Sequence, residues 1–477
     1  MYIQANSMRK SFPLYTSLLL LTVGLWACRT GRNYVQPPLP LPAQFQTATA
    51  DTLSVGDKPW QQFFTDKQLV ALIDTGLQNN YDLQLAITRI EAAGEQVKQA
   101  RAAFQPTVNA QVGANINYVS KNSLNGFSTS QFLKSDHVED YSAQVGVSWE
   151  VDVWGKLRRQ KEAAIAGYLQ TYEAKKAVQT KLVADIATAY YNLLMLDEQL
   201  AIAHHNVELG DSILSIIQLQ KTAGDANQLA VEQAYVQRQA AAVLIPQLER
   251  AIALQETGLH ILTGTLPGPV LTRTDLRSVP VEDQLTAGVP AAMVSRRPDV
   301  RSNELALVTA NANVGAAQAN MYPVLNITAS GGTDAFKASN WFNIPNSLFG
   351  IVGGTIAQPL LQHRQLKTQY EVAKINREAA VISFKQSVLN AVGEVSNALA
   401  SIDHLAEQET ITSNRMDTLK VAIFNASLLY KAGMANYLEV ITAQSNLLQS
   451  QLDFADIRRQ RLSANVELYR ALGGGWK

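Results

Sequence analysis

Two short stretches decide the architecture of this chain: AGDANQLAVEQA at residues 223–234 and AGMANYLEVITA at residues 432–443. They lie 209 residues apart, and Gly224 of the first aligns with Gly433 of the second. A glycine at such a place suits the left-handed end of one helix, and the asparagine three positions later suits the N-cap of the next. The same turn between two helices is therefore encoded twice.

The repeat extends well beyond these turns. Leu157 aligns with Leu366 at the 209-residue offset, whereas Pro106 aligns with Pro323 at an offset of 217 residues. Further identities join Asp82 with Asp299, Ala93 with Ala310, Val97 with Val314, Ala226 with Ala435, and Asn227 with Asn436. A second copy of one structural unit explains these matches. Because the first copy is longer by eight residues between Pro106 and Leu157, we expect a longer loop there.

Each copy contains a pair of segments that alternate between apolar and polar residues. In the first copy these segments run from Thr107 to Tyr118 and from Tyr141 to Asp152, with Asn, Gln, Ser, Thr and Gly at most polar positions. A period of two predicts a β-hairpin over 107–152. The second copy predicts a hairpin over 324–359, although glycines leave the period of its second segment ambiguous.

Strands of this length can cross an outer membrane. Aromatic residues lie near both ends of the first pair, with Tyr118 and Tyr141 beside the loop and Trp149 and Trp154 at the other end. A half-buried hairpin of a water-soluble protein has the same period and is the alternative. Four strands cannot close a barrel, and an open edge is not viable in hydrocarbon. The membrane interpretation therefore requires several chains to pool their strands.

Long helical hairpins follow the strands. Residues 157–222 and 366–431 contain no proline, and apolar residues recur three and four positions apart. These runs predict helices of roughly 100 Å that pack against other helices. With the returning arms, the sequence predicts helical hairpins over 157–264 and 366–472.

The two returning arms are not alike. Pro246 lies in the first arm, where the second has Ala455, so we expect a kink or break in the first arm alone. The chain then divides into two structural repeats, 61–270 and 271–477, each with a helix, a β-hairpin and a long helical hairpin.

The N-terminus reads as a targeting segment. Residues 1–27 have the pattern of a signal peptide, because Arg9 and Lys10 precede a short apolar run. The only cysteine, Cys28, follows directly and predicts a lipidation site at the start of a proline-rich N-terminal leader, 28–60. An ordinary secretory signal followed by an incidental buried cysteine is the alternative.

Composition excludes several classes of protein. Forty basic and forty acidic residues give a formal net charge of zero, which argues against a nucleic-acid-binding surface. One cysteine excludes a disulfide scaffold. The six histidines belong to no zinc-protease motif, and neither a phosphate loop nor a nucleophile elbow is present. We expect no enzyme, no catalytic residues, no metal and no cofactor.

Several motifs, taken together, point to a known family. They are Gly288–Pro290, Arg296–Val300, Ala310–Ala312, Val314–Gly315, Glu150–Arg158, Tyr437–Val440 and Leu468–Trp476. In combination they resemble the outer-membrane efflux lipoproteins of the TolC type, across most of the mature chain. The sequence departs from that family at 360–366, LLQHRQL, where a glycine pair is usual.

The resemblance implies an α+β membrane protein in which the duplicated unit of strand hairpin and long helical hairpin forms a homotrimer. Three chains would build a 12-stranded β-barrel in the cell outer membrane, continued by a periplasmic α-helical barrel. The implied function is the outer-membrane channel of a tripartite efflux pump, passively conducting small amphipathic compounds such as drugs. The implied partners are a periplasmic adaptor (membrane fusion) protein, an inner-membrane resistance-nodulation-division pump and outer membrane lipid.

The resemblance also places the periplasmic tip and its adaptor docking at the two helix turns. The residues concerned are Gly224, Asn227, Gly433 and Asn436. Glu439 is a candidate for an acidic ring at the aperture, and equally for a capping box with Asn436. Thr442 and Gln233 are further aperture candidates, with a solvated helix face as the alternative.

A protein of another class could use similar helical hairpins. A periplasmic structural or adaptor lipoprotein would keep its strands in small soluble domains. The repeated order of a strand pair followed by a long helical hairpin favours the channel.

Overall fold

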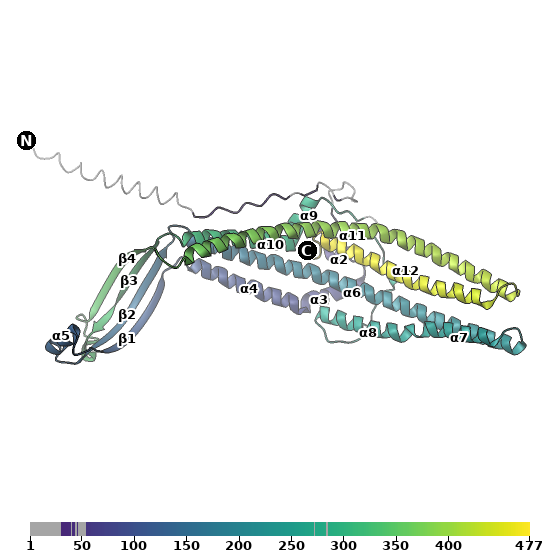
Figure 1. Cartoon of the computed structure of the whole chain (residues 1–477), viewed down its shortest axis with the longest axis horizontal. Coiled ribbons are helices and arrows are strands. Elements are labelled where there is room, and N and C mark those ends of the chain that lie inside the picture. The colour runs from purple at the N-terminus through teal and green to yellow at the C-terminus, as the bar shows by residue number, and fades with distance from the viewer. Residues whose placement is uncertain (1–29, 40, 43–44, 46–53, 271, 283–284) are drawn as a thin grey trace, which may run out of the picture. The chain divides into compact units, whose positions relative to one another are not determined.

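The computed structural model describes residues 30–39, 41–42, 45, 54–270, 272–282 and 285–477, so the predicted signal peptide and Cys28 lie outside the described residues. Figure 1 shows the elements in chain order. They are η1 (Val55–Asp57), α2 (Trp60–Phe63), α3 (Lys67–Asn79), α4 (Tyr81–Ala102), β1 (Thr107–Tyr118), α5 (Leu124–Phe132), β2 (His137–Val151), α6 (Lys156–Ala223), α7 (Gln228–Ala242), α8 (Leu244–Thr263), η2 (Leu276–Ser278), α9 (Pro290–Arg296), α10 (Pro298–Ala319), β3 (Val324–Ala335), η3 (Ala338–Asn340), β4 (Leu348–Ala357), α11 (Gln365–Lys431) and α12 (Tyr437–Ala471).

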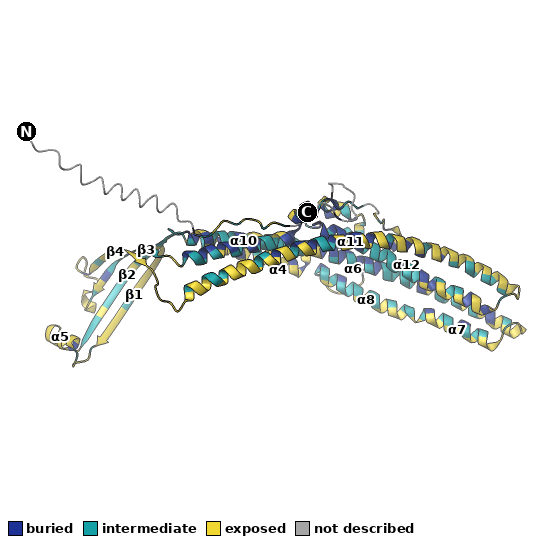
Figure 2. Ribbon diagram, turned by 45° about the horizontal axis from the view of Figure 1, so that its top comes forward, coloured by how far each residue is buried: buried dark blue, intermediate teal, exposed yellow. Residues whose placement is uncertain are grey.

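The strands of both copies form one antiparallel sheet. Its order is β1-β2-β3-β4, so β2 and β3 join the two hairpins and β1 and β4 are the edges. The loop between β1 and β2 carries the short helix α5 and is longer than the loop between β3 and β4, as the two repeat offsets predict. Figure 2 shows β1 exposed along almost its whole length.

Strand register resolves the ambiguous period of β4. Val352 pairs with Ala329, which in turn pairs with Val147 of β2, so these side chains share one face. On the opposite face, Ile351 pairs with Ser330 and Phe349 with Gly332. β4 therefore places two apolar side chains on the face that is otherwise lined mostly by uncharged polar residues.

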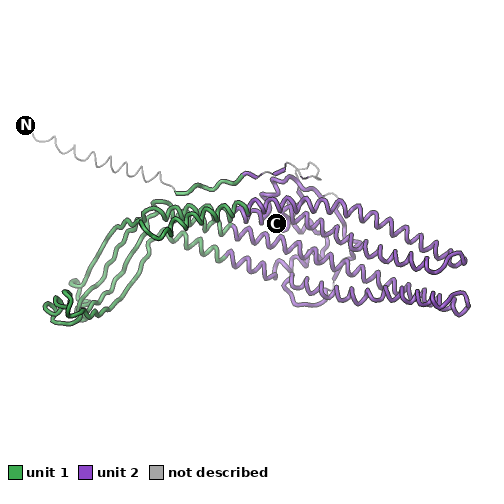
Figure 3. The backbone as a smooth tube through the Cα atoms, in the orientation of Figure 1, with its two compact units in different colours: residues 1–37, 91–169, 305–382 green, residues 38–90, 170–304, 383–477 purple. Residues whose placement is uncertain are grey.

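The chain divides into two compact units (Figure 3). The first comprises residues 1–37, 91–169 and 305–382, and contains the sheet. The second comprises residues 38–90, 170–304 and 383–477. Its largest fully buried side chains are Leu69, Ile73, Ile186, Tyr190, Leu193, Leu194, Ile217, Leu259, Leu276, Met293, Phe384 and Tyr469. Each unit takes residues from both copies of the repeat.

The helices confirm the predicted difference between the returning arms. In the first copy α7 ends at Ala242 and α8 begins at Leu244, two residues before Pro246. Proline is tolerated there because the first turn of a helix needs no N–H donor to the preceding turn. In the second copy α12 continues without a break through the buried Ala455. Among the described residues, no helix offers a stretch both long and apolar enough to cross a membrane.

The corner between the last strand of each hairpin and the long helix uses left-handed backbone in both copies. Gly155 has φ +83° in the first copy, and Arg364 at the aligned position has φ +65°. His363 beside it has φ +47°. The second copy therefore makes the turn without the glycines that the family pattern predicts, at the cost of a conformation that side chains disfavour.

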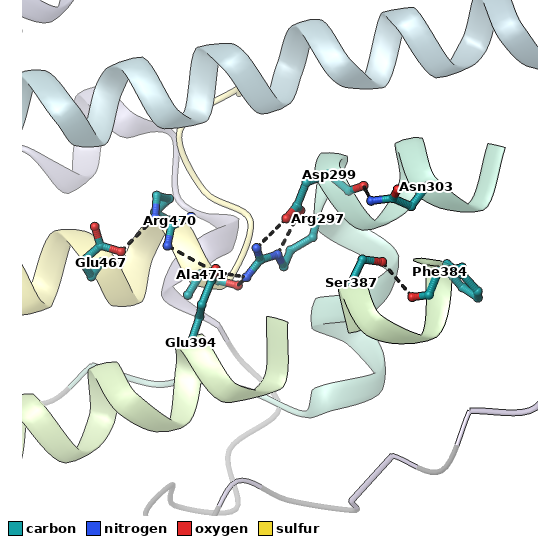
Figure 4. Close-up of polar contacts among 9 residues, drawn as sticks. All are labelled: Arg297, Asp299, Asn303, Phe384, Ser387, Glu394, Glu467, Arg470 and Ala471. Carbon is teal, nitrogen blue, oxygen red and sulfur yellow. Dashed lines mark hydrogen bonds and ion pairs between the residues drawn. The ribbon is translucent and has the colours of Figure 1, made fainter. Parts of the chain in front are cut away.

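A buried arginine holds together three helices of the second unit (Figure 4). Arg297 is 3% exposed and donates to Asp299 through Nε at 3.0 Å and Nη2 at 2.6 Å. Its Nη1 donates to Glu394 of α11 and to the carbonyl of Ala471 at the end of α12. Burial opposes the charge of Asp299, but Arg297 outweighs burial and lowers the pKa of that carboxyl.

Candidate functional site

Both helix turns that the sequence singled out have the same backbone. In the first, Gly224 has φ +93°, and its N–H donates to the carbonyl of Lys221 at 3.1 Å. The N–H of Asp225 donates to the carbonyl of Gln220 at 2.8 Å. This pair of bonds is the Schellman ending of a helix, which requires a left-handed residue. The second turn repeats both bonds around Gly433, whose φ is +67°.

The predicted caps are also confirmed. The Oδ1 of Asn227 accepts from the N–H of Ala230 at 2.9 Å, and the Oδ1 of Asn436 accepts from the N–H of Leu438 at 3.0 Å. Each asparagine thereby satisfies a donor that would otherwise lack a partner at the start of the returning helix. Each turn is fixed locally by one glycine and one asparagine.

Apolar packing joins the two hairpins at their tips. Ile217 of α6 and Ala234 of α7 are buried against Tyr437, Val440 and Ile441 of α12. Burial raises the pKa of the Tyr437 phenol, and the neighbouring Tyr430 adds to this effect.

A polar bond reinforces this contact. The hydroxyl of Tyr430, at the end of α11, donates to Oε1 of Gln220 in α6 at 2.7 Å. The rings of Tyr430 and Tyr437 lie 5.5 Å apart. The second hairpin therefore binds the first through its own pair of tyrosines.

A groove of about 750 Å³ opens where the two tips meet. Four of the predicted tip and aperture residues line it together: Asn227, Gln233, Gly433 and Asn436. Its remaining lining residues are Gln220, Asp225, Ala226, Leu229, Ala230, Tyr430, Lys431, Ala435, Tyr437 and Leu438. The lining combines polar and charged side chains with apolar ones, so the groove offers a partner both kinds of surface.

The other predicted residues lie outside the lining of this groove. Gly224 forms the first turn, and Glu439 and Thr442 are exposed on α12. The Oγ1 of Thr442 donates to the carbonyl of Leu438 at 2.7 Å. In the described structure Glu439 makes no hydrogen bond to the backbone of Asn436, so only the asparagine half of the capping box forms.

Sequence reasoning missed the contact between the tips, because it named Tyr437 only as part of a family motif and did not single out Tyr430. Tyr430 and Tyr437 align with Lys221 and Gln228 of the first copy, so they are departures from the repeat rather than matches. A search for positions where only one copy is aromatic would have found them. In the part of the chain that is described, no group of three or more His, Cys, Asp or Glu side chains could hold a metal ion.

Comparisons with known proteins agree with this architecture. Residues 72–265 and 289–474 match the family described as outer membrane efflux protein. The chain belongs to this family. It is an outer-membrane efflux protein, and the family is one of channels rather than enzymes.

Relatives of this efflux protein match over nearly their whole length. The cation efflux system protein CusC of Escherichia coli O6:H1 is 29% identical, with 96% of this chain and 98% of the relative covered. The probable efflux pump outer membrane protein SepC of Pseudomonas putida is 30% identical, with 96% of each chain covered. The open-state MtrE channel of Neisseria gonorrhoeae superimposes with a TM-score of 0.84 at 25% identity, covering 94% of this chain and 99% of MtrE.

Proposed function

We propose that three copies of this efflux protein close a twelve-stranded barrel in the outer membrane and extend it with a periplasmic barrel of helices. The observation that carries the proposal is the open sheet of four strands, whose edges β1 and β4 have no partner within the described chain. Unpaired edges cannot persist in hydrocarbon, so the strands of neighbouring copies must pair with them.

The two faces of the sheet suit a barrel wall. Val108, Val112 and Ile116 lie on one face of β1 and are 54–73% exposed. Asn109, Gln111 and Asn115 occupy the opposite face. The apolar face would contact lipid and the polar face would line a water-filled lumen.

The helical tips form the end of the protein at which the periplasmic adaptor would dock. Four helical arms per chain, α6, α7 with α8, α11 and α12, would give twelve in a trimer. Leu219, Leu229 and Phe424 are exposed near the tips and are available to neighbouring copies. The groove between the tips would receive the periplasmic adaptor, which links the channel to an inner-membrane pump of the resistance-nodulation-division type.

The channel conducts passively, with small amphipathic compounds such as drugs as the proposed cargo. Names of relatives do not decide the cargo, since CusC is named for cation efflux and SrpC of Pseudomonas putida for solvent efflux, each at 29% identity. One relative, SilC of Salmonella typhimurium, is named a probable outer membrane lipoprotein. That name supports acylation of Cys28 here, with the chain anchored by lipid as well as by its strands.

Assembly is tested by unheated gel electrophoresis of outer-membrane extracts, where we expect a heat-sensitive trimer. Val112→Lys should deplete this trimer, because a lysine facing the middle of the bilayer costs about 2–4 kcal/mol. Gln111→Lys is the matched control, since its side chain would face water in the lumen. A monomer that becomes soluble when only its lipid anchor is removed would instead identify a periplasmic adaptor lipoprotein.

The aperture is tested at Glu439. Three copies of this exposed carboxylate would form one acidic ring, because the first copy of the repeat has Ala230 at the aligned position. We expect Glu439→Ala to raise the closed-state conductance in a planar bilayer, with Glu407→Ala as the control, because Glu407 is an exposed carboxylate of α11 outside the predicted tip and aperture. An unchanged closed-state current would remove Glu439 from the aperture.

A further inference from the structure

The segment just after the predicted lipidation site is bound by a buried arginine. Arg159 of α6 is 8% exposed. Its Nε donates to the carbonyl of Thr30 at 3.3 Å, and its Nη2 donates to the carbonyl of Gly31 and to Oδ1 of Asn33, both at 3.1 Å. Glu162 neutralises the guanidinium through Nη1 at 2.7 Å. Charge-assisted bonds of this kind are the stronger hydrogen bonds in proteins.

Helix α10 completes the binding site. The side-chain amide of Asn311 donates to the carbonyl of Arg32 at 3.0 Å, and Oε1 of Gln318 accepts from the N–H of Gly31 at 3.0 Å. Residues 30–32 are thus held through their backbone, and Asn33 through its side chain, by three side chains from two helices. All of these residues belong to the first compact unit.

Two glycines allow this close approach. A Cβ atom on Gly31 would lie 2.7 Å from the Cα of Gly315, and Gly31 has φ +76°. A Cβ atom on Gly315 would lie 3.0 Å from the Arg159 side chain. A side chain at Gly31 would therefore force the segment away from α10, and a side chain at Gly315 would press on the Arg159 side chain that binds it.

The site lies at an aromatic pair between strands and helices. The hydroxyl of Thr30 donates to the carbonyl of Trp154 at 2.5 Å. The indole of Trp154 stacks on Tyr322, with ring centroids 4.9 Å apart, and donates to the carbonyl of Pro323 at 2.7 Å. In outer-membrane barrels, aromatic residues at strand ends mark the level of the bilayer interface.

We infer that the Arg159 site is a docking site for the mature N-terminus, which fixes the acylated Cys28 at the level of the Trp154–Tyr322 pair. Only two peptide units separate Thr30 from Cys28, so their Cα atoms are at most about 7 Å apart. Docking holds the acyl chains beside the strand ends, so that the lipid anchor and the strands reach the bilayer together. Arg159 is a positioning residue in this arrangement. The inference rests on the proposed acylation of Cys28 but not on the proposed cargo or adaptor.

Docking itself is measured by electron paramagnetic resonance on the full-length protein. Arg32→Cys carries the spin label, because the Arg32 side chain is exposed and only its carbonyl is used in the site. Arg159→Gln should lower the ratio of immobile to mobile label by about tenfold. Gly31→Ala should also lower this ratio, because it changes the bound segment and leaves the helices α6 and α10 unaltered. Arg158→Gln is the matched control, because Arg158 bonds to Asp152 and not to residues 30–33.

Positioning is separated from a merely structural role by a double-mutant cycle. Arg159→Gln and Gly31→Ala should each reduce the yield of heat-sensitive trimer several-fold. In a Cys28→Ser chain exported on an ordinary secretory signal, neither should reduce it further. Equal losses in both backgrounds would overturn the inference, and so would normal yield despite a mobile label.

Acylation is scored separately by radioactive palmitate. An unlabelled wild-type protein that still forms trimers would overturn this inference while leaving the channel proposal intact. A palmitate-labelled protein that forms no trimer would contradict the channel proposal and leave this inference intact.

Discussion

The two hairpin tips share a backbone and differ in what they bind. At the first tip Lys221 and Gln228 are exposed and bond to each other. At the second tip the aligned residues are Tyr430 and Tyr437, which pack on each other and on the first hairpin. The comparison shows that one glycine and one asparagine set the turn, whereas neighbouring residues decide which hairpin forms the interface. The duplicated copies keep the same turn residues, whereas their interface residues have diverged.

The largest effect is expected in the returning arms. Ala455→Pro would place in α12 the residue that the first arm carries at Pro246. Because Ala455 is 1% exposed inside an unbroken helix, the change should cost about 3 kcal/mol or more. The measurement is the temperature at which the trimer band is lost on a gel, with hydrogen exchange across α12.

Pro246→Ala is the control for that experiment. It should change stability by well under 1 kcal/mol, because Pro246 lies in the first turn of α8 and blocks no helical hydrogen bond that exists. If both variants had the same effect, the difference between the arms would have no energetic basis.

The second prediction concerns the tips. Tyr437→Ala should destabilise the contact between the hairpins by about 3 kcal/mol, since it empties the centre of a buried cluster. Gln228→Ala, at the aligned position of the first tip, should cost less than about 0.5 kcal/mol because Gln228 is exposed. Hydrogen exchange at 217–234 and 430–441 measures both. Equal protection in the two variants would contradict the assignment of the interface to the second tip.

Sequence reasoning succeeded where the cause is local. The glycine turns, the asparagine caps, the alternation of β1 and the break before Pro246 each depend on a few neighbouring residues. It could not assign the faces of β4, because Gly350, Gly353 and Gly354 remove the period and only the register with β3 restores it.

Sequence reasoning could not predict the long-range contacts, for a related reason. Tyr430 and Gln220 are 210 positions apart, and Arg159 binds residues up to 129 positions away. Neither pairing follows a spacing rule, so only the folded chain reveals them. The departure of residues 360–366 from the family pattern did mark the corner before α11, where Arg364 stands at the position aligned with Gly155.

That corner gives the smallest and most selective prediction. A Cβ atom at Gly155 would meet nothing closer than a flexible arginine terminus at 3.4 Å, so Gly155→Ala tests backbone conformation alone. It should cost about 1 kcal/mol, because φ +83° disfavours a side chain. Arg364→Gly should have the opposite sign and a smaller size, since relief of strain is partly offset by the greater freedom of glycine in the unfolded chain.

The melting temperature of the purified trimer measures both variants against wild type. A gain from Arg364→Gly together with a loss from Gly155→Ala would show that the two copies make the same turn at different energetic cost. Two losses would mean that the Arg364 side chain contributes more through its surroundings than its backbone costs.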